Sequence, residues 1–86
     1  MKNFKVTIEI MPLESVLDPQ GEAIELIVKN KNEYKANNFR VGKKIQFSIS
    51  SNSKSECEKQ VNKLCKEFLV NEIIEHYEIS IRNEKD

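Results

Sequence analysis

The strongest periodic signal in this sequence is a run of apolar residues between positions 57 and 69. Its members recur at the spacing of one side of an α-helix. They are Cys57, Val61, Leu64, Cys65, Phe68 and Leu69. Ser55 and Glu58 have the spacing of a capping box, so this helix is predicted to begin at Ser55, and Asn71 suits its end. A helix with one apolar side must bury that side against another element.

Three other segments alternate apolar and polar residues with a period of two, which predicts half-buried strands. Their apolar positions are Phe4, Val6, Ile8 and Ile10 within residues 4–11, then Ile45, Phe47 and Ile49, and finally Tyr77, Ile79 and Ile81. The segment 36–41 is more weakly patterned. With Gly42 at a turn, it is predicted to form a hairpin with the strand that follows.

A first helix is predicted after the first strand. Asp18 is a good N-cap, and Pro19 suits the first helical position, where its missing N–H would have had no partner. Ala23, Ile24, Ile27 and Val28 form a one-sided apolar stripe that lasts until the polar residues 30–32.

The predicted order is strand, helix, strand, strand, helix, strand over a single domain, residues 1–86. This order resembles the ferredoxin-like α+β two-layer sandwich, in which both helices cover one face of an antiparallel sheet. The other sheet face is left uncovered. An open face or a free edge strand is commonly closed by another subunit, so we expect oligomerisation to complete the fold through one of the two.

Composition excludes several classes of protein. The 86 residues include 14 basic and 14 acidic side chains, so zero net charge argues against nucleic acid or an acidic membrane as partner. Apolar runs of two or three residues are far too short to span a bilayer, and the N-terminus lacks the apolar core of a secretory signal. We therefore expect a cytoplasmic protein. A chain this small can bury only a limited apolar area in its core, which is a second reason to expect association with another subunit.

Side chains that could carry chemistry are few. Cys57 and Cys65, eight positions apart on one helix, would lie about 12 Å apart, too far for a disulfide, which predicts two reduced core thiols. His76 is the single histidine. These three residues lack the spacing of a zinc site, and no nucleophile has an evident base. We therefore predict no catalytic residue, metal or cofactor in this chain.

Two short motifs stand out. Residues 16–21 combine a cap, a first-turn proline and Gly21 at the third helical position, where glycine costs about 1 kcal/mol relative to alanine and so suggests a close backbone approach. The motif is either a well-capped helix start or a contact surface that uses the free N–H groups. Residues 39–44 form a basic turn, which is either solvated or binds a partner or phosphate.

Three segments together resemble the PurS family, the small subunit of phosphoribosylformylglycinamidine synthase. They are residues 15–24 with the string Val-Leu-Asp-Pro-Gln-Gly, the turn 40–43, and the run 65–77. The resemblance covers almost the whole chain in the right order, and it departs from the family pattern at residues 29–32, where a Leu-Gly pair is usual.

The resemblance implies a non-catalytic subunit in the fourth step of de novo purine synthesis. It would bridge a glutaminase subunit and a large synthase subunit that uses ATP and Mg²⁺, and assist ammonia transfer between them. It would do so as a homodimer or a dimer of dimers. We predict docking residues at the two motifs: Leu17, Asp18, Pro19, Gln20, Gly21, Arg40, Gly42 and Lys43.

Two other classes share this order of elements. A ferredoxin-like regulator would bind a small metabolite and need no companion subunits. An RNA-binding module would need a basic sheet with exposed aromatic side chains, whereas Phe4, Phe47 and Tyr77 fit the core pattern.

Overall fold

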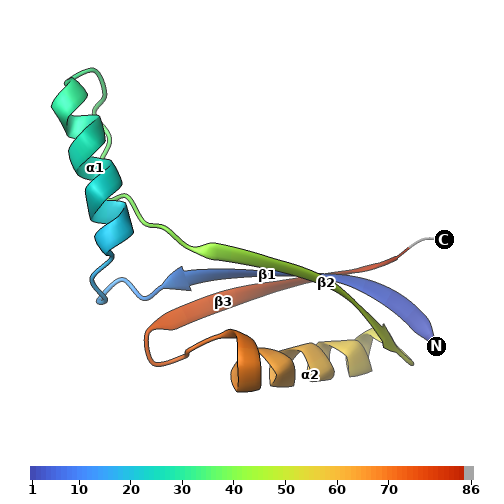
Figure 1. Cartoon of the computed structure of the whole chain (residues 1–86). Coiled ribbons are helices and arrows are strands. Elements are labelled where there is room, and N and C mark those ends of the chain that lie inside the picture. Colours follow the sequence, from blue (N-terminus) through green and yellow to red (C-terminus); the bar gives the residue numbers. More distant parts are fainter. Residues whose placement is uncertain (85–86) are drawn as a thin grey trace.

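The computed structural model describes residues 1–84 of the chain. Its elements are β1 (Lys2–Pro12), α1 (Pro19–Lys31), β2 (Lys43–Ser51), α2 (Lys54–Leu64), the single π-helical turn η1 (Cys65–Leu69) and β3 (Glu75–Asn83). The three strands form an antiparallel sheet in the order β2-β1-β3, with α2 packed along one face (Figure 1). None of the helices within residues 1–84 combines the length and apolar character that crossing a bilayer requires.

The register of the sheet places the apolar positions of the three predicted alternations on one face. Val6 of β1 lies opposite Phe47 of β2 and Ile81 of β3, and the neighbouring pairs follow the same period of two. The central strand is fully covered, whereas the inward side chains of β2 and β3 are only partly buried. The three predicted alternations are therefore confirmed, and the opposite face of the sheet is polar, as expected.

The core is built by β1 and by the apolar side of α2 with its π turn. Its buried members are Phe4, Val6, Ile8, Ile10, Cys57, Val61, Cys65 and Val70. Both cysteines are free thiols, as predicted, and burial raises the pKa of each. A thiol with a raised pKa carries little thiolate at neutral pH, so these two side chains behave as small apolar residues.

The predicted hairpin is wrong, because residues 1–84 form three strands instead of the expected four. Residues 36–42 form no regular element, and they pair with no strand within residues 1–84. Their N–H groups bond to side chains near α1: Phe39 donates to Glu25 Oε1 at 3.0 Å and Val41 to Asp18 Oδ2 at 2.7 Å. Gly42 is not at a hairpin turn, since it directly precedes β2.

The placement of α1 also differs from the prediction that both helices cover one face of the sheet. α2 lies on the sheet, whereas α1 projects from its end and lies beside the segment 36–42 (Figure 1). Because the chain enters and leaves α1 at the same end of the sheet, the helix points away from its own strands. Its apolar stripe is accordingly exposed at Ile24 and Ile27.

The helix ends differ slightly from expectation. The cap of α2 lies two residues earlier than predicted, at Ser53 and not at Ser55: the Oγ of Ser53 accepts the N–H of Glu56 at 3.1 Å. Ser53 and Glu56 also have the spacing of a capping box, so sequence alone does not separate the two choices. The helix closes at Leu69 through the π turn, and Asn71 follows two residues later.

Candidate functional site

Asp18 joins the start of α1 to the segment that returns from it. Its Oδ1 accepts the N–H of Gly21 at 3.0 Å, which is the predicted N-cap bond, and its Oδ2 accepts the N–H of Val41 at 2.7 Å. These two hydrogen bonds and the charge of Arg40 hold the pKa of Asp18 below its usual value. The side chain is therefore a carboxylate at neutral pH, and it caps α1 while fixing a segment 23 residues further along the chain.

Gly21 lies where the backbone of the returning segment comes closest to α1. A Cβ atom at this position would lie 2.1 Å from the carbonyl oxygen of Phe39, a distance that no side chain tolerates. Gly42 is equally constrained, since its Cβ would lie 2.2 Å from the carbonyl oxygen of Ile10. The close backbone approach predicted at Gly21 is therefore confirmed, and its cause is the neighbouring segment of the same chain.

Arg40 ties the returning segment to the connection between β1 and α1. Its Nη2 donates to the carbonyl oxygen of Leu13 at 2.6 Å and to that of Val16 at 3.1 Å. The Leu13 carbonyl oxygen also accepts the N–H of Val16 at 2.9 Å within the turn, so the half-buried guanidinium gives it a second, charged donor. Arg40 is thus engaged within its own chain.

The two motifs that the sequence singled out lie next to each other in space. We call this region the base of α1. An open groove of about 370 Å³ runs across it, and the start of β3 forms its far wall. It is lined by Ile10, Pro12, Val16, Leu17, Asp18, Pro19, Gln20, Val41, Gly42, Lys43, Ile74 and Glu75. What the sequence presented as two separate contacts is a single surface in the structure.

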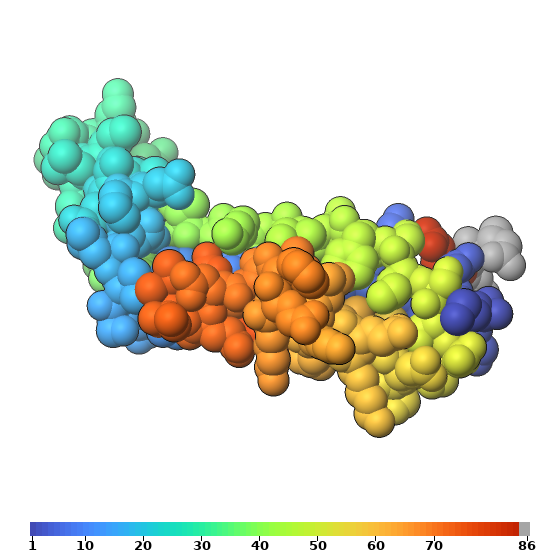
Figure 2. All heavy atoms as spheres, turned by 60° about the horizontal axis from the view of Figure 1, so that its bottom comes forward, coloured from blue at the N-terminus to red at the C-terminus, as the bar shows by residue number. Residues whose placement is uncertain are grey.

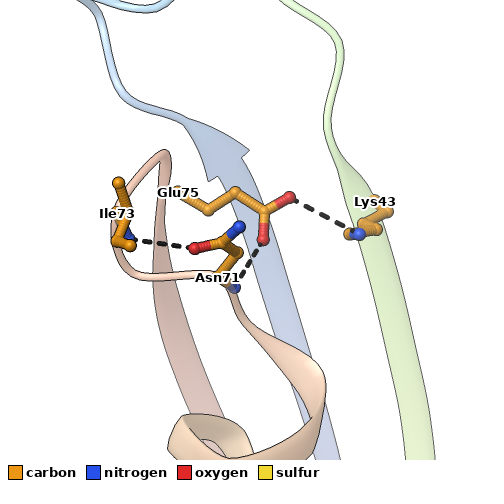
Figure 3. A network of polar contacts seen from close by, with 4 residues as sticks. All are labelled: Lys43, Asn71, Ile73 and Glu75. Atoms are coloured by element: carbon orange, nitrogen blue, oxygen red, sulfur yellow. Dashed lines mark hydrogen bonds and ion pairs between the residues drawn. The ribbon is translucent and has the colours of Figure 1, made fainter.

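The far wall of the groove is held by a network around Glu75 (Figure 3). Glu75 Oε1 accepts the N–H of Asn71 at 2.9 Å, and its Oε2 lies 3.5 Å from Lys43 Nζ. Asn71 Oδ1 in turn accepts the N–H of Ile73 at 3.2 Å. Glu75 was not among the predicted site residues. It lies 32 positions from Lys43 in the sequence, and no short-range pattern predicts that these two side chains form an ion pair.

The predicted docking residues divide into two groups by exposure. Asp18 and Gly21 are buried and Arg40 is half-buried, so these three build the base. The other five are exposed at the surface and can contact a partner: Leu17, Pro19, Gln20, Gly42 and Lys43. Leu17 is the largest apolar side chain among them, and it is 71% exposed where it lines the groove.

The residues considered for chemistry do not converge. Since side chains alternate along β3, His76 lies on the polar face of the sheet, opposite to the face that buries Cys65. Within residues 1–84, His, Cys, Asp and Glu side chains form no group of three that could hold a metal ion. The hydrogen bonds and close backbone contacts at the base of α1 instead fix the direction in which this helix points.

The sequence profile of the PurS family, described as phosphoribosylformylglycinamidine (FGAM) synthase, matches residues 5–83. The PurS subunit of FGAM synthase from Thermotoga maritima is 33% identical over 79 residues, which is 92% of this chain and 96% of that protein. The corresponding subunit from Bacillus subtilis is 28% identical over 78 residues, 91% of this chain and 92% of the other.

Solved structures agree with this assignment. A crystal structure of the Thermotoga maritima PurS subunit is 32% identical, with a TM-score of 0.81 over 95% of this chain and 92% of that one. A chain in the structure of PurLQS from the same organism is also 32% identical, with a TM-score of 0.84 over 98% of this chain and 100% of that one. The chain described here therefore belongs to the PurS family of phosphoribosylformylglycinamidine synthase subunits.

Proposed function

We propose that this chain is the non-catalytic small subunit of an FGAM synthase complex, in which it holds a glutaminase subunit and a large ATP-dependent synthase subunit together. The observation that supports this most directly is the similarity to a chain of PurLQS from Thermotoga maritima, which extends over nearly the full length of both chains.

In such a complex the chemistry is divided among the subunits. The glutaminase releases ammonia from glutamine, and the large subunit uses ATP with Mg²⁺ to join that ammonia to formylglycinamide ribonucleotide. The contribution of this chain is positional: a fixed relation between two active sites lets ammonia pass without loss to solvent. The base of α1 suits this task, because hydrogen bonds of 2.6 to 3.1 Å at Asp18 and Arg40 lock the start of the helix to the two segments that connect it to the sheet.

The exposed residues of the base are proposed as the docking surface. Leu17 offers an apolar contact, Gln20 can form hydrogen bonds through its side-chain amide, and Lys43 supplies a positive charge beside Glu75. An apolar anchor surrounded by polar groups is the usual composition of a protein interface. Asp18, Gly21 and Arg40 would then act indirectly, by holding the contact residues in position.

We place the complex in the cytoplasm, where glutamine, ATP and the purine precursors are available. The two free thiols, Cys57 and Cys65, are consistent with a reducing compartment.

The test is FGAM synthesis by the purified large and glutaminase subunits, with and without this chain, supplied either with glutamine or with free ammonium. We expect glutamine-driven synthesis to require the chain and ammonium-driven synthesis to proceed without it. If the chain changes neither rate, the bridging role is wrong. If it is needed equally for both, it acts on the synthase itself and not on ammonia transfer.

A further inference from the structure

β3 is an edge strand of the sheet, with β1 on one side and no strand on the other within residues 1–84. All 9 of its residues pair with β1 in one unbroken register, and its sequence contains no proline or lysine, two residues that commonly protect an edge from further pairing. The opposite edge strand, β2, begins with Lys43 and Lys44. β3 is therefore the less protected of the two edges.

The backbone groups at the outer edge of β3 are those of its odd-numbered residues. In an antiparallel pair, residues whose N–H and C=O groups face the neighbouring strand alternate with residues whose groups face away from it. At the two ends of the pair, Glu84 donates its N–H to the carbonyl oxygen of Asn3 and Leu13 donates to that of Ile74, each at 2.9 Å. Even-numbered positions therefore face β1, and the N–H and C=O groups of residues 77, 79 and 81 face outward.

An open groove of about 410 Å³ lies between this edge and α2. A single helix covers only part of the three-stranded sheet, as the green residues of β2 beside the yellow and orange α2 show in Figure 2. The inward side chains Tyr77, Ile79 and Ile81 of β3 are accordingly only partly buried. The groove is lined on the β3 side by Ile79, Ser80 and Ile81 and on the α2 side by Lys54, Glu58 and Asn62.

The composition of this groove decides what kind of segment fits it. An apolar helix would bury the charges of Lys54 and Glu58 against a surface that cannot pair with them, which costs free energy. An extended segment avoids that cost, because its backbone pairs with the outward N–H and C=O groups of β3 and only every second side chain enters the groove. Those side chains meet the apolar floor of Ile79 and Ile81 and the charged wall of α2.

We infer that the outer edge of β3 is a second docking surface, and that it adds one strand of the partner subunit that the base of α1 does not hold. The inference rests on the proposed function, since a chain that holds two different subunits together needs two separate surfaces. The added strand becomes the fourth of the sheet, beside β3. It carries apolar side chains over Ile79 and Ile81 and a basic side chain beside Glu58, which complements the charge of the wall.

Hydrogen exchange of individual amides tests this pairing directly, because an added strand protects alternate residues only. In this chain alone, the N–H groups of Ile79 and Ile81 should exchange quickly, whereas that of Ser80, which faces β1, should be protected. In the complex with both larger subunits, exchange at Ile79 and Ile81 should slow by about 100-fold or more, with Ser80 protected as before. Unchanged exchange at Ile79 and Ile81 would overturn the inference. Protection of both in the isolated chain would also overturn it, since a second copy would then occupy the edge.

Variants at the edge test which partner is bound there. Ile79→Pro removes one outward N–H, and Ile79→Ala, which shortens the side chain but keeps the N–H, is its matched control. Glu58→Lys reverses the charge of the groove wall, with the exposed Lys59→Asp as control. The three subunits are mixed with glutamine, ATP and Mg²⁺, and sedimentation over a range of concentrations shows which partner each variant retains.

Ile79→Pro and Glu58→Lys should each weaken the binding of one partner by about tenfold or more, and Leu17→Asp that of the other, whereas both controls should retain both partners. The inference is overturned by an edge variant that assembles like its control, that loses both partners, or that loses the same partner as Leu17→Asp. If Ile79→Pro loses its circular dichroism signal, Glu58→Lys decides the question, because Glu58 is exposed and outside the core.

The two proposals fail separately. A complex in which the edge of β3 becomes protected, but which makes FGAM from glutamine no faster than the two larger subunits alone, would contradict the bridging role and leave the edge contact standing. Glutamine-driven synthesis that requires this chain and is unchanged in both Ile79→Pro and Glu58→Lys would contradict the edge contact alone.

Discussion

The two ends of this molecule are held together by different forces. In the sheet and α2, stability comes from burial: Phe4, Val6, Ile8 and Ile10 are at most 1% exposed, and α2 covers them. At α1 the apolar side is exposed, and the helix is held at its base by hydrogen bonds that Asp18 accepts and Arg40 donates. Burial of apolar side chains stabilises the fold but does not fix the orientation of an element. Hydrogen bonds and close backbone contacts fix that orientation, and they contribute less free energy. One end therefore makes the fold stable, and the other sets where a helix points.

The largest expected effect is on the buried end. Ile8→Ala removes a fully buried side chain from the central strand and should lower the free energy of unfolding by about 2–5 kcal/mol. The measurement is urea denaturation followed by circular dichroism at fixed protein concentration. Lys5→Ala, on the exposed face of the same strand, is the control and should change it by less than about 0.5 kcal/mol. Equal losses in the two variants would contradict this account of the core.

The next effect separates the base of α1 from the core. In an unconstrained helix, Gly21→Ala would stabilise by about 1 kcal/mol. Here the added Cβ would lie 2.1 Å from the Phe39 carbonyl oxygen, so the returning segment must move, at a cost of about 1–3 kcal/mol that outweighs the gain. Hydrogen exchange should show faster exchange at the N–H groups of Phe39 and Val41 and unchanged protection in β1. Unchanged exchange at Phe39 and Val41 would show that the contact does not hold α1.

A smaller effect is expected from Asp18, and it depends on pH. Because its pKa is lowered in the folded chain, the stabilisation by the carboxylate is present above the pKa of the unfolded chain and is lost as pH falls through the folded value. Asp18→Asn should lower the melting temperature by several degrees at pH 7, and the difference from the parent should shrink toward pH 3. Thermal melts across this range at constant ionic strength measure it. A difference that stays constant with pH would mean that the charge of Asp18 does not contribute.

The contrast between the two ends also explains what the sequence could predict. The period-two pattern of Phe4, Val6 and Ile8 and the cap at Asp18 depend on neighbours in the chain, and both are confirmed. Apolar periodicity in α1 predicted a one-sided apolar stripe, but such a pattern does not say which surface would cover the stripe, and the structure leaves Ile27 exposed.

The joining of the two motifs at the base could not be read from the sequence for a related reason. Asp18 and Val41 are 23 residues apart, and their bond depends on the direction in which the chain leaves α1. The hairpin was predicted from Gly42 as a turn residue between the weakly patterned segment 36–41 and the alternating strand that follows. In the structure, the backbone N–H groups of residues 39 and 41 donate to side-chain acceptors and not to a strand. Gly21 was the local feature that indicated a close approach of another backbone segment to α1, since glycine in a helix is otherwise unfavourable.

The smallest effect on folding is expected at the exposed rim of the base, and there the comparison becomes a functional one. Leu17→Asp and Gln20→Ala alter side chains that lie on the surface, so each should change the free energy of unfolding by less than about 0.5 kcal/mol. If these residues dock a partner, both variants should nevertheless weaken assembly with the large and glutaminase subunits, Leu17→Asp by tenfold or more, because a charge replaces the apolar contact. Titration of each variant against glutamine-driven synthesis measures this, with Lys59→Asp as a control on the outer side of α2. Normal titration curves for both variants would show that the base orients α1 without touching a partner, and the docking surface would then have to be sought along the helix itself.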